Sequence, residues 1–426
     1  MKIVYLHQYF RRPSESGGTR SYEMARRLVK WGHEVHIVTS WQEPDRHTDW
    51  FQTEEAGIHV HWLPVPYSNS MGYGRRIRAF FRFALLSACK AASLEGDVVF
   101  ATSSPLTIAL PAVYAAWRKK IPMVFEVRDL WPEIPIAIGA LRNPVLKLVA
   151  RWMERWAYRN AESVIALSPG MRDGVVGAGY PADRVAVIPN SSDNDLFQKV
   201  DKQEIEHFRA NRAWLGARPL LVYAGTFGRV NGLGYLVDLA DQLKVVAPEV
   251  RILVVGDGQE IDIIRQRAAR LGVLDVNFHM EPSIPKRDVP VLFGAADMTI
   301  STTIDLPELR ANSANKFFDS LAASRPILLN YGGWQAELVE AAGCGIVTWN
   351  LPINDAANRI AACITDRTWL DKAGEAAHIL ACELFDRDML AKRLEQVLLG
   401  AAQRNGRQAS SVADGNYALV IEQRRR

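Results

Sequence analysis

The sequence predicts an α/β fold of two facing Rossmann-like domains. Two series of short apolar runs, the first starting at residues 2–6 and the second at 220–224, alternate with stretches of helical periodicity. The turn-rich segment Pro189-Asn190-Ser191-Ser192 separates the two series. Strands alternating with helices form parallel sheets that bind ligands at the carboxyl ends of their strands. We therefore expect a deep inter-domain cleft that holds the ligand.

The first half reads as a strand, a glycine loop, a helix and a second strand. The strand covers residues 2–6, Gly17 and Gly18 lie in the loop, the helix ends at Gly32, and the next strand covers 35–39. There is no G-x-G-x-x-G, which argues against a nicotinamide or flavin enzyme. Further strands are expected at 59–63, 98–101, 123–126, 163–166 and 185–188.

The second half repeats this alternation. Its expected strands cover residues 220–224, 252–255, 276–279, 298–301 and 327–329, with a helix over 233–246 and a final helical region near 384–400. We predict one domain over residues 1–195 and a second over 196–385. A helix over 386–402 should pack back on the first domain, and the basic tail 403–426 should be disordered.

Composition excludes several classes of protein. The 426 residues are 48% hydrophobic and 23% charged, as in a soluble globular protein, and a net charge of +4 argues against extensive nucleic-acid binding. The four cysteines are scattered without metal-ligand spacing, which favours a reducing compartment. The N-terminal residues lack the apolar core of a signal peptide. We expect a cytoplasmic protein.

The most informative stretch is SANKFFDSLAASRPILLNYGGW, residues 313–334. Lys316 falls in the first turn of its expected helix, where free backbone N–H groups favour an anion, and Asp319 follows three residues later. A cation and a carboxylate so placed suit a nucleotide diphosphate and its ribose hydroxyls. An ordinary surface lysine and aspartate would produce the same pattern.

An ordered set of motifs resembles the family 4 retaining glycosyltransferases. It comprises GGTRSYEMARRLVKWGHEVHIVTS (17–40), FEVRDLWPE (125–133), SVIALSPGM (163–171), VIPNSSDNDLF (187–197), AGTFGRVNGLGYLV (224–237), VVGDG (254–258) and SANKFFDSLAASRPI (313–327). RDLWPE and the NKFFD segment are similar to the bacterial transferases of L-fucosamine and other deoxy-amino sugars in O-antigen and capsule assembly. The resemblance implies the GT-B fold and a nucleotide-sugar donor.

The resemblance also implies donor-binding residues. Gly17 and Gly18 would approach the donor phosphates, and Arg229 matches the first cation that holds the diphosphate. The second cation of the family is missing at Val230-Asn231-Gly232, so Lys316 is its best substitute. Asp319 matches the family's ribose-binding glutamate, whereas Ala311 stands where a sugar-binding glutamate is usual. The remaining expected donor contacts are Gly225, Gly256, Glu308 and Asn315.

In the first domain, Asp129 of RDLWPE directly follows a strand and could act as general base. It could equally be a loop aspartate that pairs with Arg128 or caps a turn. Arg128 and Glu133 are second choices, and Trp131 could stack on an acceptor sugar. His7, just after the first strand, is a lesser candidate.

A basic amphipathic helix is expected over residues 74–90. Ile77, Phe80, Phe81, Ala84 and Ala88 would share one face, with Arg75, Arg78 and Arg82 opposite. Such a helix could lie on an anionic membrane, which would suit a lipid-linked acceptor. A core-packed helix with solvated arginines is the alternative.

Taken together, the residues and the resemblance predict a metal-independent retaining glycosyltransferase without a cofactor, peripheral on the inner face of the cell membrane. It would move a sugar, such as N-acetylfucosamine, from a UDP-sugar to a polyprenyl-diphosphate-linked saccharide. The Asp-x-Asp pairs at 193–195 and 386–388 lack the context of a metal site. One alternative is a GT-B sugar-nucleotide epimerase, which needs no lipid acceptor. Another is a non-catalytic sugar-nucleotide-binding subunit, favoured by the missing glutamate and cation.

Overall fold

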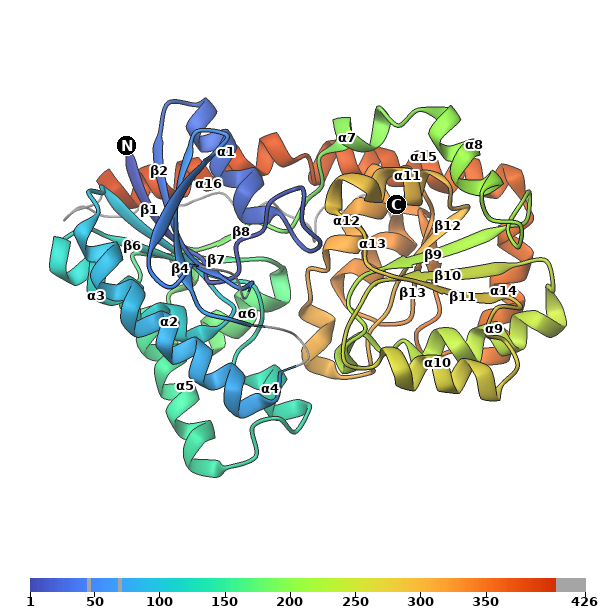
Figure 1. Cartoon of the computed structure of the whole chain (residues 1–426), viewed down its shortest axis with the longest axis horizontal. Coiled ribbons are helices and arrows are strands. Elements are labelled where there is room, and N and C mark those ends of the chain that lie inside the picture. Colours follow the sequence, from blue (N-terminus) through green and yellow to red (C-terminus); the bar gives the residue numbers. More distant parts are fainter. Residues whose placement is uncertain (44–46, 68–70, 404–426) are drawn as a thin grey trace. The chain divides into compact units, whose positions relative to one another are not determined.

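The structure is a computed structural model that describes residues 1–43, 47–67 and 71–403. The chain divides into two compact units. Unit 1 comprises Met1–Arg12, Thr19–Pro189 and the C-terminal stretch from Asp388, and unit 2 comprises Pro13–Gly18 and Asn190–Arg387. Both are layered α/β units with a largely parallel sheet, so the predicted pair of Rossmann-like domains is confirmed (Figure 1).

The sheet of unit 1 has eight strands in the order β3-β4-β2-β1-β5-β6-β7-β8. They are β1 (Lys2–Leu6), β2 (Glu34–Trp41), β3 (Phe51–Glu55), β4 (Ile58–Pro64), β5 (Val98–Thr102), β6 (Met123–Val127), β7 (Ser163–Ala166) and β8 (Val185–Val187). All neighbours are parallel except β3, which runs antiparallel to β4. Every predicted strand of this half is confirmed. β3 was missed because its sequence, FQTEE, is polar and half-exposed at the sheet edge.

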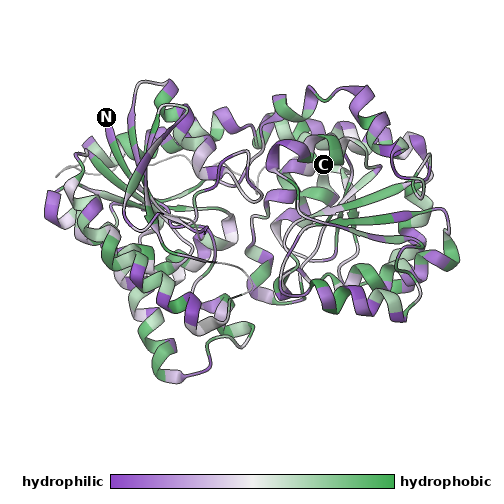
Figure 2. Cartoon of the chain, in the orientation of Figure 1, coloured by the Kyte–Doolittle hydropathy of each residue, from purple (hydrophilic) through white to green (hydrophobic). Residues whose placement is uncertain are grey.

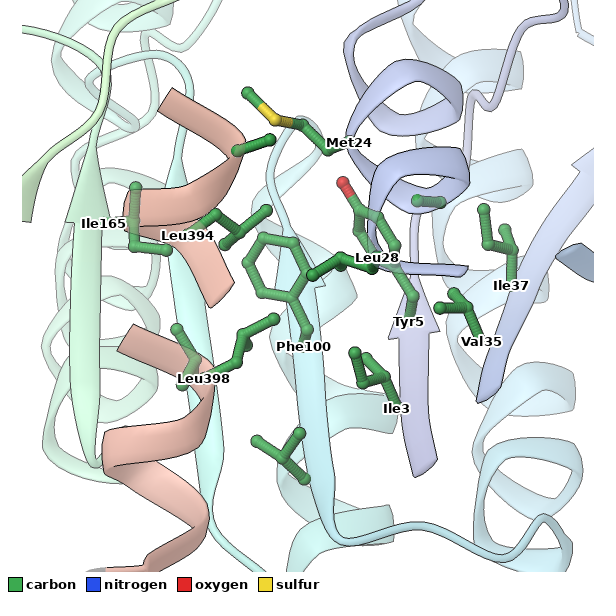
Figure 3. Packing of buried hydrophobic residues seen from close by; sticks show 14 of the residues in the cluster. Ile3, Tyr5, Met24, Leu28, Val35, Ile37, Phe100, Ile165, Leu394 and Leu398 are labelled. Carbon is green, nitrogen blue, oxygen red and sulfur yellow. The ribbon is translucent and has the colours of Figure 1, made fainter. Parts of the chain in front are cut away.

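The helices of unit 1 lie on both faces of this sheet. They are α1 (Arg20–Lys30), α2 (Tyr73–Ser93), α3 (Ala109–Lys119), α4 (Glu133–Ala137), α5 (Pro144–Arg159), α6 (Pro169–Gly177) and α16 (Arg387–Gln403). Leu28 of α1 and Leu394 of α16 pack with Tyr5 and Phe100 of the sheet in one buried cluster (Figure 3). The helix expected near the C-terminus therefore completes the core of the first unit.

The sheet of unit 2 has six parallel strands in the order β11-β10-β9-β12-β13-β14. They are β9 (Leu220–Ala224), β10 (Arg251–Val255), β11 (Phe278–Glu281), β12 (Met298–Ser301), β13 (Ile327–Leu329) and β14 (Gly345–Val347). Its helices are α7 (Asn194–Gln198), α8 (Lys202–Ala210), α9 (Gly234–Val246), α10 (Ile261–Arg270), α11 (Val289–Gly294), α12 (Asn315–Ala322), α13 (Trp334–Ala342), α14 (Ile353–Ile364) and α15 (Arg367–Leu384). Three short 3₁₀ helices follow strands of this sheet: η3 (Arg229–Asn231), η4 (Lys286–Asp288) and η5 (Pro307–Ala311). η3 and η5 carry the predicted site residues Arg229 and Glu308.

Some boundaries differ from the prediction. The expected domain boundary after residue 195 falls inside unit 2. The cause is local, since Asn190 donates to the Ser313 carbonyl at 2.6 Å and Ser192 to Asp319 at 2.8 Å. The helical region expected near 384–400 is confirmed as α16, which begins at Arg387. β11 begins two residues later than expected, and the tail expected to be disordered lies outside the described residues.

The apolar face predicted for α2 is wrong at several positions. Ala84 is buried and Phe80 packs against Tyr67, with ring centroids 6.1 Å apart. Ile77 and Phe81 are instead exposed, while Phe83 is fully buried. The reason is that α2 packs against α3 and buries a face that includes Ala79, Phe83, Ala84 and Ser87, which helical periodicity alone could not select.

Candidate functional site: two strand edges

The site of unit 2 is built at the carboxyl ends of β9 and β10. Gly225 follows β9 directly, and its N–H bonds to the carbonyl of Val255, the last residue of β10, at 2.9 Å. A Cβ on Gly256 would come within 1.8 Å of the Gly225 carbonyl oxygen. A Cβ on Gly225 would come within 2.9 Å of Lys316 Cε. Close packing against the backbone therefore requires a glycine at 256, and Gly225 leaves room for the Lys316 side chain at the same edge.

Lys316 lies beside this glycine turn. It is the second residue of α12, and its Nζ donates to Asn231 Oδ1 at 3.2 Å. The ammonium also lies over the Tyr223 ring, 4.9 Å from the centroid. Burial lowers the pKa of Lys316 to about 8, although Asp319 acts in the opposite direction. The cation is thus partly desolvated and held at the first turn of a helix.

Arg229 belongs to the same neighbourhood. It is the exposed first residue of η3, and Asn231, the partner of Lys316, ends that same short helix. η3 is held to the end of β12 because Thr302 Oγ1 donates to the Asn231 carbonyl at 2.7 Å. The structure therefore brings the Arg229 loop and Lys316 together at one strand edge, a relation between residues far apart in the sequence.

Asp319 is committed to contacts inside the protein. Its carboxylate accepts a hydrogen bond from Ser192 Oγ at 2.8 Å and forms a salt bridge with Lys286. The residue is 5% exposed, and Lys286 also lies over the Phe197 ring. Neither Ser192 nor Lys286 was singled out in the sequence, because nothing near Asp319 in the chain indicates them. The predicted ribose contact of Asp319 stays a prediction.

The glycine loop after β1 belongs to unit 2. The Lys286 N–H donates to the Glu15 carbonyl at 3.1 Å, and the Arg287 N–H to the Pro13 carbonyl at 3.3 Å. Gly17 has a φ of 116°, which a residue with a side chain rarely adopts. Gly17 and Gly18 are thus placed with η4 by backbone contacts.

The two remaining donor candidates flank α12. Glu308 is a half-buried residue of η5, and Asn315 is the half-buried first residue of α12. The turn between them is set by Asn312, whose Oδ1 accepts from the Ala314 N–H at 3.2 Å. Their role toward a sugar stays a prediction.

The site of unit 1 gathers at the carboxyl ends of β1, β5 and β6. Arg128 Nη1 donates to His7 Nε2 at 3.2 Å, and Ser104 Oγ donates to Asp129 Oδ2 at 2.7 Å. Burial and the nearby Arg128 charge hold the pKa of His7 well below its usual value. Desolvation raises the pKa of Asp129, against the hydrogen bond from Ser104 and the charge of Arg128. Asp129 nevertheless remains accessible to solvent.

The other acceptor candidates are arranged around a short helix. Trp131 is half-buried, and its N–H donates to the Asp129 carbonyl at 3.0 Å. Glu133 begins α4 and pairs with Arg151 of α5 at 3.1 Å. That ion pair gives Glu133 a role in joining α4 to α5, while Trp131 stays close to Asp129.

A buried ion pair beneath this edge was missed in the sequence. Arg20 donates to Glu126 at 2.8 and 3.0 Å and also to the carbonyls of Ile188 and Pro189. Glu126 also accepts from Thr102 at 2.6 Å. Burial would raise the pKa of Glu126, but the charge and hydrogen bonds of Arg20 lower it. The pair joins α1 and β6 to the segment Ile188-Pro189 that follows β8.

Among the residues described, no group of three His, Cys, Asp or Glu side chains is arranged to hold a metal ion. In the same part of the chain, no helix has both the length and the apolar composition needed to cross a membrane.

Similar proteins share this architecture over most of the chain. A GDP-mannose-dependent α-(1-6)-phosphatidylinositol monomannoside mannosyltransferase of Mycobacterium tuberculosis is 22% identical over 401 residues, covering 91% of this chain and 96% of that protein. Anabaena HepE, solved with UDP and glucose, superposes with a TM-score of 0.70 at 18% identity, over 94% and 99% of the two chains. WaaG, a glycosyltransferase involved in lipopolysaccharide biosynthesis, superposes with a TM-score of 0.66 at 16% identity, over 93% and 100%.

Two family models cover the two halves. The glycosyl transferase 4-like domain matches residues 17–191, and the glycosyl transferases group 1 model matches residues 204–379. The predicted resemblance to family 4 is confirmed at this level, whereas the likeness to fucosamine transferases stays a prediction. With both models matched in order and the fold in agreement, the chain belongs to the GT-B glycosyltransferases that combine a glycosyl transferase 4-like domain with a group 1 domain.

Proposed function

We propose that this glycosyltransferase moves an N-acetyl deoxyhexosamine, such as N-acetylfucosamine, from a UDP-sugar to a polyprenyl-diphosphate-linked saccharide. Transfer occurs with retention of configuration, without a metal, in O-antigen or capsule biosynthesis at the inner face of the cell membrane. The observation that carries the proposal is the juxtaposition of Lys316 with the Arg229 loop through Asn231. It supplies two cations where a sugar-diphosphate bond would break.

On the donor side, Lys316 and Arg229 bind the diphosphate. Charge builds on the leaving UDP as the glycosidic bond breaks, and fixed cations that are partly desolvated stabilise it strongly. The backbone N–H groups at the start of α12 further stabilise this negative charge. Gly225 and Gly256 keep the strand edge free of side chains, so the phosphates can approach the backbone. Asp319 orients the ribose, with Ser192 and Lys286 restraining its carboxylate.

On the acceptor side, the attacking hydroxyl forms the new glycosidic bond on the face from which UDP departs, which retains the configuration. Its proton passes to the departing diphosphate oxygen or to Asp129. The raised pKa of Asp129 makes it a stronger base than an ordinary aspartate, and the Ser104 hydrogen bond fixes its orientation. Arg128 and Trp131 flank the acceptor at the same edge.

The relatives support individual parts of this proposal. The mycobacterial enzyme is named for a GDP-sugar donor and a lipid acceptor, HepE was solved with UDP, and WaaG is described as involved in lipopolysaccharide biosynthesis. The names of the first two proteins both include a nucleoside diphosphate, which the Lys316 site fits. The choice of UDP and of a deoxy-amino sugar rests on the motif resemblance in the sequence.

The first test is the thermal stability of the purified protein with UDP, GDP, dTDP or ADP in the absence of divalent metal. A ligand at a hundred times its dissociation constant stabilises a fold by about 2.7 kcal/mol, which is readily measured. We expect stabilisation by UDP alone, lost in Arg229→Ala and in Lys316→Ala. Stabilisation by GDP alone would contradict the choice of donor, and no shift with any nucleotide would contradict the diphosphate site.

A transfer assay then separates this function from its alternatives. Incubation with UDP-N-acetylfucosamine and a polyprenyl-diphosphate saccharide should yield an extended lipid-linked product. An epimerase would instead convert the sugar nucleotide without any acceptor. A protein that binds UDP but neither transfers nor isomerises the sugar would be a non-catalytic subunit.

A further inference from the structure

The exposed apolar side chains of unit 1 gather on one layer of helices. Among the described residues, every strongly exposed large hydrophobic side chain of unit 1 lies on α2, α3 or α5. α3 packs against both α2 and α5, and Figure 1 shows the three helices on the side of the sheet away from α1. Hydrophobic residues are prominent along these helices in Figure 2. Apolar surface concentrated in this way indicates a partner of low polarity.

α5 contributes most of this surface. Val145, Leu148, Val149 and Trp152 follow one another at helical spacing and are 64%, 71%, 49% and 60% exposed. The opposite face of α5 is buried in unit 1 through Glu154, Ala157 and Tyr158. The outward stripe is therefore not needed to hold the helix in place. On α2, Ile77, Phe81 and Leu85 form a second exposed row at a spacing of four residues.

The charges around these stripes are almost all positive. α5 carries the exposed cations Arg151, Arg155 and Arg159, and its one carboxylate, Glu154, is buried. α2 carries exposed Arg75, Arg78 and Arg82, and neither α2 nor α3 contains an acidic residue. The nearby carboxylate of Glu133 is paired with Arg151. Apolar side chains bordered by cations are complementary to an anionic lipid surface.

A second copy of the chain would fit this surface less well. An isologous contact brings the same patch of two subunits together, which would place the arginines of one copy against those of the other. An anionic bilayer neutralises the same cations and accepts the aromatic and aliphatic side chains at its interface. Charge complementarity therefore selects the bilayer as the occupant.

We propose that α5, together with the exposed row of α2, seats unit 1 on an anionic membrane surface. Val145, Leu148, Val149 and Trp152 enter the headgroup region while Arg151, Arg155 and Arg159 contact lipid phosphates. The biological purpose of this contact rests on the proposed function, because a lipid-linked acceptor would be presented at that surface. The contact extends the membrane role expected of residues 74–90 to a helix that the sequence did not indicate.

The experiment is co-sedimentation of the full chain with vesicles of phosphatidylcholine alone or of phosphatidylcholine with phosphatidylglycerol. The wild-type protein should bind the anionic vesicles, and raised salt should weaken that binding. Leu148→Gln/Trp152→Gln should lower partitioning by about tenfold or more. The matched control is Val245→Gln/Ile263→Gln, which changes two exposed apolar residues of unit 2. It should bind as the wild type does.

Circular dichroism and melting temperature establish that each variant is folded. Wild-type protein that ignores anionic vesicles, or an α5 variant that binds them as strongly as wild type, would overturn the proposal. So would light scattering that shows a dimer dissociated by the α5 substitutions, in the absence of vesicle binding. UDP stabilisation measured without lipid tests the donor site separately. If UDP did not stabilise the protein, the proposed function would be contradicted, whereas the result on membrane binding would be unaffected.

Discussion

Lys316 Nζ donates a hydrogen bond to Asn231 Oδ1 at 3.2 Å, which ties the first turn of α12 to the short helix that begins at Arg229. The loop has no cation at Val230-Asn231-Gly232, and Lys316 of α12 contacts it at Asn231. An uncharged asparagine holds a lysine supplied by another element. The arrangement leads directly to predictions on donor binding.

Lys316→Ala should lower kcat/KM for sugar transfer by about 100- to 1000-fold, because a fixed charge that stabilises the leaving diphosphate is lost. Steady-state kinetics with a soluble acceptor analogue would measure this. Lys244→Ala is the control, since Lys244 contacts the carbonyl of Leu271 on the surface of unit 2. Comparable losses in both variants would show that general destabilisation, not the site charge, is responsible.

Asn231→Ala should reduce donor affinity less than Lys316→Ala, because the cation remains but loses one restraint. The two substitutions should be non-additive, since both act on one contact. Calorimetric titration of UDP into the two single variants and the double variant measures the coupling. Independent, additive effects would mean that Asn231 does not position Lys316 for the ligand.

Donor binding should weaken as the pH rises through about 8, where the pKa lowered by burial lets Lys316 lose its charge. Below that pH the ammonium is present and binding is at full strength. Lys316→Arg should bind UDP with an affinity that stays level over the same range, because a guanidinium remains charged. The UDP dissociation constant, measured from pH 7 to about 9.5, checks this. An equal decline in both proteins would assign the titration to another group.

The stability of unit 1 should depend on pH through Glu154. This residue is 7% exposed, and burial raises its pKa from 4.5 to about 7. The folded state then holds a proton that the unfolded state releases, so the free energy of unfolding should fall between pH 4.5 and 7. The loss is about 3 kcal/mol. Urea unfolding of the wild type and of Glu154→Gln checks this, because the variant should lack that decline.

Arg20→Met should destabilise unit 1 by about 3–5 kcal/mol, because it leaves the buried Glu126 carboxylate without its cation. Adding Glu126→Gln should restore part of the loss. Denaturant unfolding followed by circular dichroism measures both effects. Arg26→Ala on the same helix removes a contact with Glu23 made by a half-exposed arginine and should change stability little. A neutral Arg20→Met would show that the ion pair is dispensable.

The periodicity of the sequence predicted most strands of the two sheets but missed the edge strands β3 and β14. The apolar runs KIVYL and LLVYA are central strands β1 and β9, and such short β-branched and apolar runs are typical of parallel sheets that are covered on both faces. Gly225 and Gly256 could also be singled out as strand-end glycines, and a close backbone approach requires the one at 256. The family motifs added Arg229 and Lys316 as candidates.

Tertiary structure decided which residues meet. Asn231 and Lys316 are separated by 85 residues, and Lys286 and Asp319 by 33, and no local pattern indicates either contact. The local sequence likewise does not show which apolar face of α2 or of α5 is buried. A helix buries the side that its neighbours cover, so Phe83 became core and Trp152 surface. The sequence alone therefore determined most of the strands, the family and the candidate charges. The partners of those charges and the exposed face of each helix followed only from packing, because they depend on elements distant in the chain.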